Sequence, residues 1–160
     1  MEHIRSVPLR GDPEENGRGG KLSSKLSVGT HILTLLALER GENLTSQQIA
    51  GSVNTNPVVI RRLLGLFRKA GLVESKKGIG GGWVLLADPE QITLLDVLRA
   101  VEPQNKIFVH HRCGPNVQCP VGRNIQGVLN EIYAEIQKGM AERLARSSIG
   151  SVMATLEDRM

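Results

Sequence analysis

The chain has 160 residues and a mass of 17.4 kDa, enough for one or two small domains with a modest hydrophobic core. Apolar residues make up 40% and charged residues 22% of the sequence, a globular composition that excludes a disordered or membrane-embedded chain. Aromatic residues make up only 2%, too few for an RNA surface that stacks bases, whereas the net charge of +4 leaves double-stranded DNA open as a partner.

Residues 1–21 have balanced charge, two Pro, four Gly and no apolar period, so we expect a disordered tail of native or cloning origin. Neither this segment nor a later one has the apolar stretch of a secretory signal or the roughly 18 to 20 apolar residues of a membrane span. We therefore expect a cytoplasmic protein that does not contact a membrane.

Two helices are expected next. Residues 24–39 carry apolar side chains almost all round a helical wheel, so this helix should be central and buried. Thr45 or Ser46 is a good N-cap for a short helix over residues 46–53, whose apolar residues lie four apart and so share one face.

A third helix is expected after a polar cluster and a proline. Asn56 precedes Pro57, whose ring suits the first helical position, and Gly71 ends the pattern, which predicts a helix over residues 57–70. Apolar side chains share one face of this helix, and arginines occupy the other. The segment 22–77 holds 8 Lys and Arg against 3 Asp and Glu, which indicates either an anion-binding face or a solvated basic surface.

The segment that follows, LVESKKGIGGGWVLLADP, contains two strand-like runs on either side of a glycine-rich turn, which predicts a β-hairpin. Two short helices, the second one cationic, followed by a hairpin with a basic tip are the element order of a winged helix-turn-helix. We therefore expect a mainly α fold with a small β-hairpin wing.

The expected DNA-binding domain spans residues 22–102 and ends with one more helix. Thr93 and Asp96 form a capping-box pair at the start of that helix, whose apolar residues share one face. Residues 103–123 then contain Pro, Gly, two His and both Cys without any period, which predicts a cysteine-containing loop. A loop of this length is usually functional or disordered.

The region 124–160 is expected to form a dimerisation helix and a short C-terminal docking segment. Apolar residues recur at gaps of three and four over residues 124–144, which predicts one long helix with a single apolar stripe. The domain 22–102 is too small to cover the whole stripe, so we expect the same helix of a second copy to cover part of it; the alternative is packing on its own domain. The expected dimer contacts are Ile125, Leu129, Ile132, Ile136 and Met140.

The expected DNA contacts lie at the starts of the second and third helices and on the wing. Arg can grip guanine, Asn can pair with adenine and a valine methyl can touch thymine, so these residues could read bases, with Arg61 the first choice. The alternative is that the arginines only hold phosphates. On the wing, lysines supply charge and glycines allow close backbone approach, or merely form a flexible turn. The expected contacts are Ser46, Asn56, Val58, Val59, Arg61, Arg62, Lys76, Lys77, Gly78 and Gly81.

The motifs KAGLV, GGG, ADP and ITL, at their positions in the stretch NPVVIRRLLGLFRKAGLVESKKGIGGGWVLLADPEQITLLDVLRAVE, resemble the Rrf-two family of winged-helix transcriptional regulators. With the first helix and the long last one, the resemblance covers about residues 22–145. It implies a bacterial dimeric transcription factor with crossed long helices. It also implies base contacts by Val58, Arg61 and Arg62 in the major groove and places Lys77 where the wing enters the minor groove.

The cysteines depart from the pattern of the cluster-binding members of this family, which carry three Cys spaced C-x5-C-x5-C. Cys113 and Cys119 keep the first spacing, but Ile125 stands at the third place and offers no ligand. His110 and His111 are adjacent, so they point apart and are poorly placed to bind one metal together. We therefore expect no metal and no iron–sulfur cluster, as in the cluster-free YwnA-like branch, which the run Cys-Pro-Val-Gly followed by Asn-Ile-Gln resembles.

The sequence therefore predicts a sequence-specific DNA-binding transcriptional regulator, a repressor that acts as a homodimer and responds to an unknown small-molecule or redox signal in its loop or in a cavity between helices. One alternative is a redox-responsive or metal-responsive sensor that uses Cys113 and Cys119. Less favoured alternatives are a winged helix that docks proteins and a thiol enzyme with Cys119 as nucleophile and His110 or His111 as base. Because no catalytic set or phosphate-binding motif is present, we do not expect an enzyme.

Overall fold

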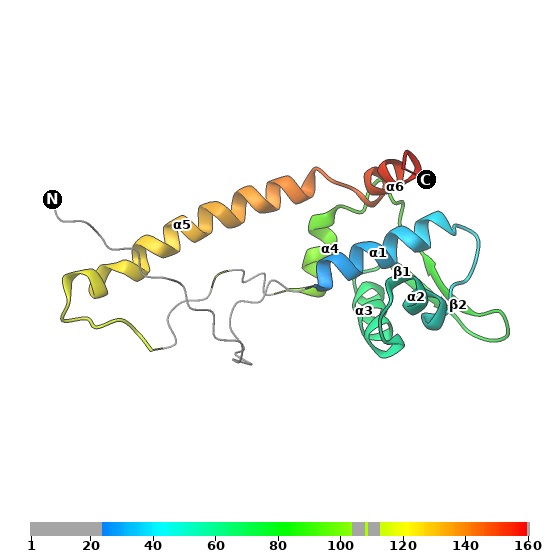
Figure 1. Cartoon of the computed structure of the whole chain (residues 1–160), viewed down its shortest axis with the longest axis horizontal. Coiled ribbons are helices and arrows are strands. Elements are labelled where there is room, and N and C mark those ends of the chain that lie inside the picture. The colour runs from blue at the N-terminus through cyan, green and yellow to red at the C-terminus, as the bar shows by residue number, and fades with distance from the viewer. Residues whose placement is uncertain (1–23, 104–107, 109–112, 160) are drawn as a thin grey trace.

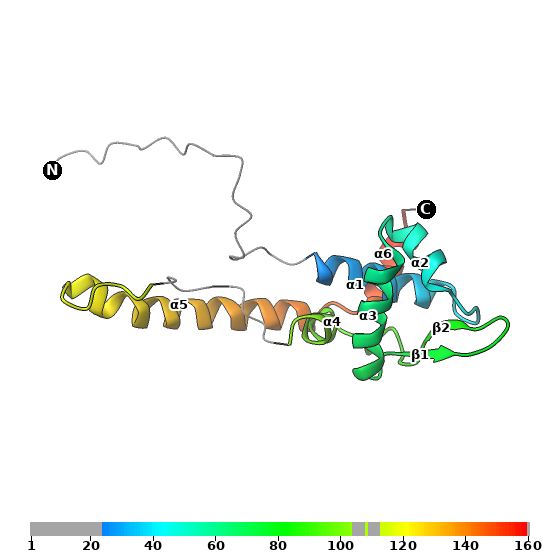
Figure 2. The ribbon, with the colours of Figure 1, turned by 90° about the horizontal axis from the view of Figure 1, so that it is seen from below.

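A computed structural model of the chain describes residues 24–103, 108 and 113–159. The expected tail over residues 1–21, and both His110 and His111, lie outside the described residues. Helices gather at one end of the molecule with a small hairpin at their outer edge, and one long helix extends away from them (Figures 1 and 2). The elements are α1 (Lys25–Leu38), α2 (Ser46–Val53), α3 (Pro57–Lys69), β1 (Val73–Lys76), β2 (Gly82–Leu85), α4 (Leu94–Val101), α5 (Pro120–Ala145) and α6 (Ile149–Glu157).

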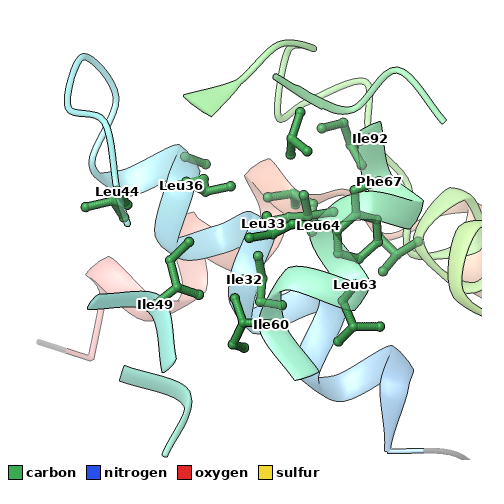
Figure 3. Close-up of a cluster of buried hydrophobic side chains, with 14 of the residues drawn as sticks. Ile32, Leu33, Leu36, Leu44, Ile49, Ile60, Leu63, Leu64, Phe67 and Ile92 are labelled. Atoms are coloured by element: carbon green, nitrogen blue, oxygen red, sulfur yellow. The ribbon is translucent and has the colours of Figure 1, made fainter. Parts of the chain in front are cut away.

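The first helix, α1, lies at the centre of the domain, as its apolar composition predicts. It contacts α2, α3, α4, α6 and β2. Ile32 and Leu33 are completely buried, and Figure 3 shows them beside Ile60 and Leu64 of α3. A helix with neighbours on nearly every side needs apolar residues on nearly every side, which explains why it shows no single apolar face.

A glycine lets α1 and α3 approach each other closely. A Cβ atom at Gly29 would lie 2.8 Å from Cζ of Phe67 and 3.2 Å from Cγ1 of Val97. The ring of Phe67 is completely buried, so it fills the space that a side chain at Gly29 would need. This contact sets the position of α3, and therefore of its exposed face, relative to the rest of the core.

The expected hairpin is present, and it has an additional neighbour. β1 and β2 pair antiparallel, with Val73 opposite Leu85 and Lys76 opposite Gly82. Leu44, in the connection between α1 and α2, forms an isolated bridge with Trp83 through two backbone hydrogen bonds of 2.8 and 3.1 Å. The edge of β2 that faces away from β1 is therefore attached to the helical domain.

The fourth helix begins with the capping box that the sequence predicts. The Thr93 hydroxyl oxygen accepts from the backbone N–H of Asp96 at 3.1 Å, and the Asp96 carboxylate accepts from the Thr93 N–H at 3.0 Å. α4 packs against α1 and α3 on one side and contacts α5 on the other, so it joins the domain to the long helix.

The long helix begins earlier than its apolar pattern predicts. α5 begins at Pro120 rather than at Asn124, because Pro120 occupies the first helical position after Cys119, as Pro57 does in α3. The end of the predicted loop, residues 120–123, is therefore the first turn of α5. Among the residues that the structure describes, no helix combines the length and apolar character needed to cross a membrane.

The last helix, α6, returns to the domain and packs against α1. Its N-cap, Ser148, forms a bridge with Thr93, and the carbonyl of Ser147 accepts from the N–H of Leu94 at 2.8 Å. Ile149 is completely buried. These contacts of the α6 start fix the end of α5 to the start of α4.

The close approach at Gly29 predicts opposite effects for two glycine substitutions. Gly29→Ala should lower the free energy of unfolding by about 1 kcal/mol or more, because overpacking against a buried ring outweighs the better helix propensity of alanine. The matched change Gly65→Ala, in α3, should raise it by about 0.5 to 1 kcal/mol, because a Cβ atom there meets nothing within 4 Å. Chemical denaturation measures both, and a stabilising Gly29→Ala would contradict this packing.

Candidate nucleic-acid interface

A helix-turn-helix is formed by α2 and α3, and side-chain caps define both of its helices. Thr45 and Gln48 form a capping box at the start of α2. α2 ends at Asn54 in the left-handed conformation, with φ of 57°. Asn56 then caps α3, since its Oδ1 accepts from the N–H of Val58 at 2.8 Å. Three local interactions therefore set the turn and the direction in which α3 leaves it.

The first two turns of α3 carry an exposed face that is both apolar and cationic. Val58 and Val59 are 61% and 43% exposed, and Arg61 and Arg62 are exposed beside them. The opposite face is buried in the core (Figure 3). Within the described residues neither arginine has an acidic partner, so both guanidinium groups are available to an external anion.

Two of the expected contact residues have a structural role that limits what they can offer to DNA. Asn56 uses its side-chain oxygen as the cap of α3, so its amide nitrogen is the part left for a base or a phosphate. Ser46 is half-buried at the first position of α2. A contact of either residue with DNA stays a prediction.

The tip of the hairpin is a turn with a defined backbone conformation. Gly78 and Gly80 have φ values of 95° and 74°, and the N–H of Gly81 donates to the carbonyl of Gly78 at 3.0 Å. A Cβ atom at Gly81 would collide with the carbonyl oxygen of Lys76, so only glycine fits there. Asn43 also donates from Nδ2 to the carbonyl of Gly80 at 2.8 Å, which ties the tip to the α1–α2 connection. These contacts favour a defined surface over the flexible-turn alternative.

The tip presents Ile79, which is not among the expected DNA contacts, between its two left-handed glycines. Ile79 is 110% exposed, more than any other large apolar side chain of the described residues. The exposed Lys76 and Lys77 precede it. An apolar residue inside the glycine-rich run KGIGGG is the sequence signal that could have identified it, since a turn tip normally carries polar residues. Figures 1 and 2 show the hairpin loop reaching beyond the helices.

The described residues leave the apolar stripe of α5 largely uncovered. No residue of this 26-residue helix is buried. Ile132 and Ile136 are 46% and 49% exposed, and the other expected dimer contacts, Ile125, Leu129 and Met140, are half-buried. The alternative that α5 covers its stripe on its own domain is therefore not what the described residues show. Phe108 stacks on Tyr133 of α5, with ring centroids 4.4 Å apart, so part of the preceding loop lies along the helix.

Cys113 and Cys119 are both exposed and form no disulfide. Cys119 is the N-cap residue of α5. The backbone N–H groups of Gly122 and Val121 lower the pKa of its thiol, because they stabilise the thiolate at the start of the helix. Within the described residues no three His, Cys, Asp or Glu side chains come together as metal ligands.

Three comparisons relate this chain to known proteins. A model of the Rrf2 family, described as iron-dependent transcriptional regulators, matches residues 22–155. YwnA of Bacillus subtilis strain 168, a candidate HTH-type transcriptional regulator, is 43% identical over 132 residues, which are 82% of this chain and 96% of that protein.

Two solved structures share the fold. The crystal structure of a candidate DNA-binding protein is 41% identical, with a TM-score of 0.67 over 81% of this chain and 99% of that one. The structure of CymR, the global cysteine regulator of B. subtilis, is 26% identical, with a TM-score of 0.63 over 84% of this chain and 97% of that one.

Proposed function

The chain belongs to the Rrf2 family of transcriptional regulators, and we propose from this that it binds double-stranded DNA as a homodimer and represses transcription. In this proposal α3 enters the major groove and the β1–β2 tip lies on the adjacent minor groove. The observation that carries the proposal is the exposed face of α3, on the first turns of a helix whose start is fixed by a cap. Two exposed valines lie there beside two arginines that have no acidic partner among the described residues.

This face has the chemistry of base recognition as well as of phosphate binding. A guanidinium can bond the O6 and N7 atoms of guanine, and a valine side chain can contact the methyl group of thymine. The N-terminus of α3 also directs its positive dipole end toward the same surface, which favours phosphate. We assign Arg61 to base recognition and Arg62 to base or phosphate contact.

The wing tip has a different role in this proposal. Lys76 and Lys77 contact phosphates, and the fixed turn lets the Gly78 and Gly81 backbone approach the strand. The exposed Ile79 is then placed in the minor groove, where apolar side chains can press between base steps. Exposure of this apolar side chain to water is unfavourable, and insertion into the groove would remove it from water.

The uncovered stripe of α5 supports the homodimer. Five apolar residues follow one line along the helix, and the described part of the chain buries none of them. Two antiparallel copies of α5 would cover both stripes by a self-complementary contact. A helix of 26 residues is about 39 Å long, which is close to the roughly 34 Å between successive major grooves on one side of DNA.

We propose repression because a dimer of this kind can occupy a promoter. The described residues form a winged helix-turn-helix, the long helix α5 and the short helix α6, and a dimer of them can occupy a promoter. We propose that the dimer works without an iron–sulfur cluster, because two thiols and the apolar Ile125 do not supply the ligands that a cluster requires.

Substitutions of Arg61 and Lys77 should have different effects on DNA binding. Arg61→Ala should cost about 1 to 3 kcal/mol on the cognate site and relax base preference, while Lys77→Ala should weaken all duplexes alike and flatten the salt dependence by about one counterion. Arg159→Ala, beyond the end of α6, removes the same kind of charge from another surface and should have little effect. Equal behaviour of the Arg61 and Lys77 variants in salt-dependent titrations would contradict the assigned roles.

Ile132→Glu should separate the dimer, because it places a charge in the centre of the apolar stripe. We expect monomers in analytical ultracentrifugation and at least a tenfold loss of operator affinity. Ala134→Glu adds the same charge on the opposite side of α5 and should leave the dimer intact. A dimer that withstands Ile132→Glu would place the interface elsewhere.

The lowered thiol pKa of Cys119 favours one second candidate, a redox-responsive regulator. Hydrogen peroxide would accept two electrons from the thiols of Cys113 and Cys119, leaving a disulfide and two water molecules. We expect the signal to be of another kind, so DNA affinity should be the same before and after peroxide treatment. A peroxide effect that is present in the wild type and absent in Cys119→Ser would favour the redox alternative.

A further inference from the structure

A pocket of about 420 Å³ lies between α1, α2 and α6, on a part of the domain that the proposed DNA and dimer contacts do not use. This volume is within the roughly 300 to 1,000 Å³ of small-molecule sites in proteins. Most of its surface is apolar and comes from Leu35 and Leu38 of α1 and from Val152 and Leu156 of α6. Leu38 and Leu156 are 36% and 40% exposed, so two large apolar side chains remain open to solvent there.

The pocket also has a small number of polar groups. Thr34 lines it and is only 3% exposed, and within the described residues its hydroxyl has no hydrogen-bond partner. A buried hydroxyl without a partner is unfavourable, so a ligand atom that bonds to it would be stabilised. His31 of α1 and Ser52 of α2 also line the pocket, and their Nε2 and Oγ atoms lie 3.0 Å apart.

The side chains of the pocket define what it can accept. None of its lining residues is Lys, Arg, Asp or Glu, and the one ionisable side chain in its wall, His31, already contacts Ser52 through Nε2. The wall therefore offers little to pair with a fully charged group, and burial of such a group without a partner is costly. The Thr34 hydroxyl and the His31–Ser52 pair can bond one hydroxyl or carbonyl group. The chemistry therefore fits a small, uncharged, mainly apolar molecule with one such group.

We propose that this pocket binds a molecule of that class and that this molecule is the signal that controls DNA binding, an inference that rests on the proposed function. The three helices that form the pocket link the two ends of the regulator. α2 belongs to the helix-turn-helix, α6 is hydrogen-bonded through its N-cap region to the start of α4 and follows α5 directly, and α1 packs against both. A molecule between them changes the angle of α2 and α3 relative to α5, and so the distance between the two recognition helices of a dimer.

Such a signal can act only if it binds one arrangement of the helices more tightly than the other. The contact between the exposed side chains of His31 and Ser52 links α1 and α2 in the pocket wall, so a ligand group inserted between them would replace this direct link between the two helices. The protein with an occupied pocket then binds its operator more weakly than the protein with an empty pocket.

The test uses the full chain and three probes of similar size, namely phenol, benzoate and benzylammonium. Phenol should bind with a dissociation constant on the order of 1 mM, the strength expected of so small a ligand, and should shift the NMR signals of Thr34 and Leu156. The two charged probes should bind at least tenfold more weakly. Saturating phenol should lower the affinity of the protein for its selected DNA by about fivefold or more.

Two variants and one control test whether phenol acts through this pocket. Thr34→Val keeps the shape but removes the hydroxyl, so it should weaken phenol about five- to tenfold. Val152→Phe fills the pocket and should abolish both phenol binding and the effect on DNA, while Val117→Phe, on an exposed residue outside the pocket, should change neither.

Three results would overturn the inference. One is that no probe binds, or that the charged probes bind as well as phenol. A second is that phenol reaches the pocket only in the monomeric Ile132→Glu variant, since the second copy would then be its occupant. A third is that phenol binds there and DNA affinity stays the same, which would leave DNA binding itself intact. Failure of the chain to bind any DNA would instead contradict the proposed function.

Discussion

The contact between Phe67 and Gly29 is the constraint on which the DNA-facing surface depends. Because Gly29 has no side chain, the ring of α3 reaches the surface of α1, and the apolar face of α3 enters the core completely. The amphipathic character of α3 then leaves the arginines and valines of its first turns outward. The close approach at Gly29 of α1 therefore helps to determine which side chains of α3 face outward.

The long helix is constrained at one end and uncovered along most of its length. α4 and the hydrogen bonds around Ser147 and Ser148 fix its C-terminal end to the domain. Its N-terminal part has no neighbour among the described helices (Figure 2). Because α5 is a rigid rod, a small rotation of the domain at its C-terminal end produces a larger displacement at its N-terminal end. α5 can therefore transmit changes in the domain to the partner that covers its apolar stripe.

Most of the fold could be predicted from local rules. Pro57 after Asn56, and Asp96 three residues after Thr93, mark helix starts by interactions within one turn, and the structure contains both. The start of α5 was missed because the apolar period begins only at Ile125, whereas Pro120 already suits the first helical position.

The remaining features depend on contacts between residues far apart in sequence. The Leu44–Trp83 bridge joins segments separated by two helices, and neither segment alone contains a signal for it. The pocket beside the buried Thr34 hydroxyl, which has no partner among the described residues, is formed only once α6 returns to α1. The exposure of Ile79 depends on a turn that Asn43 holds from another loop. Sequence patterns describe faces of single elements, and these sites lie between elements.

The central claim is that two copies of this chain bind one duplex through charged contacts and base contacts. The most direct measurement is titration of genomic fragments selected by the protein, with stoichiometry determined and salt varied from about 50 to 200 mM. The account predicts two chains per duplex and an affinity that falls by about a hundredfold or more across this range, as counterions are released from several phosphates. Selection that enriches no fragment, or an affinity that does not depend on salt, would contradict it.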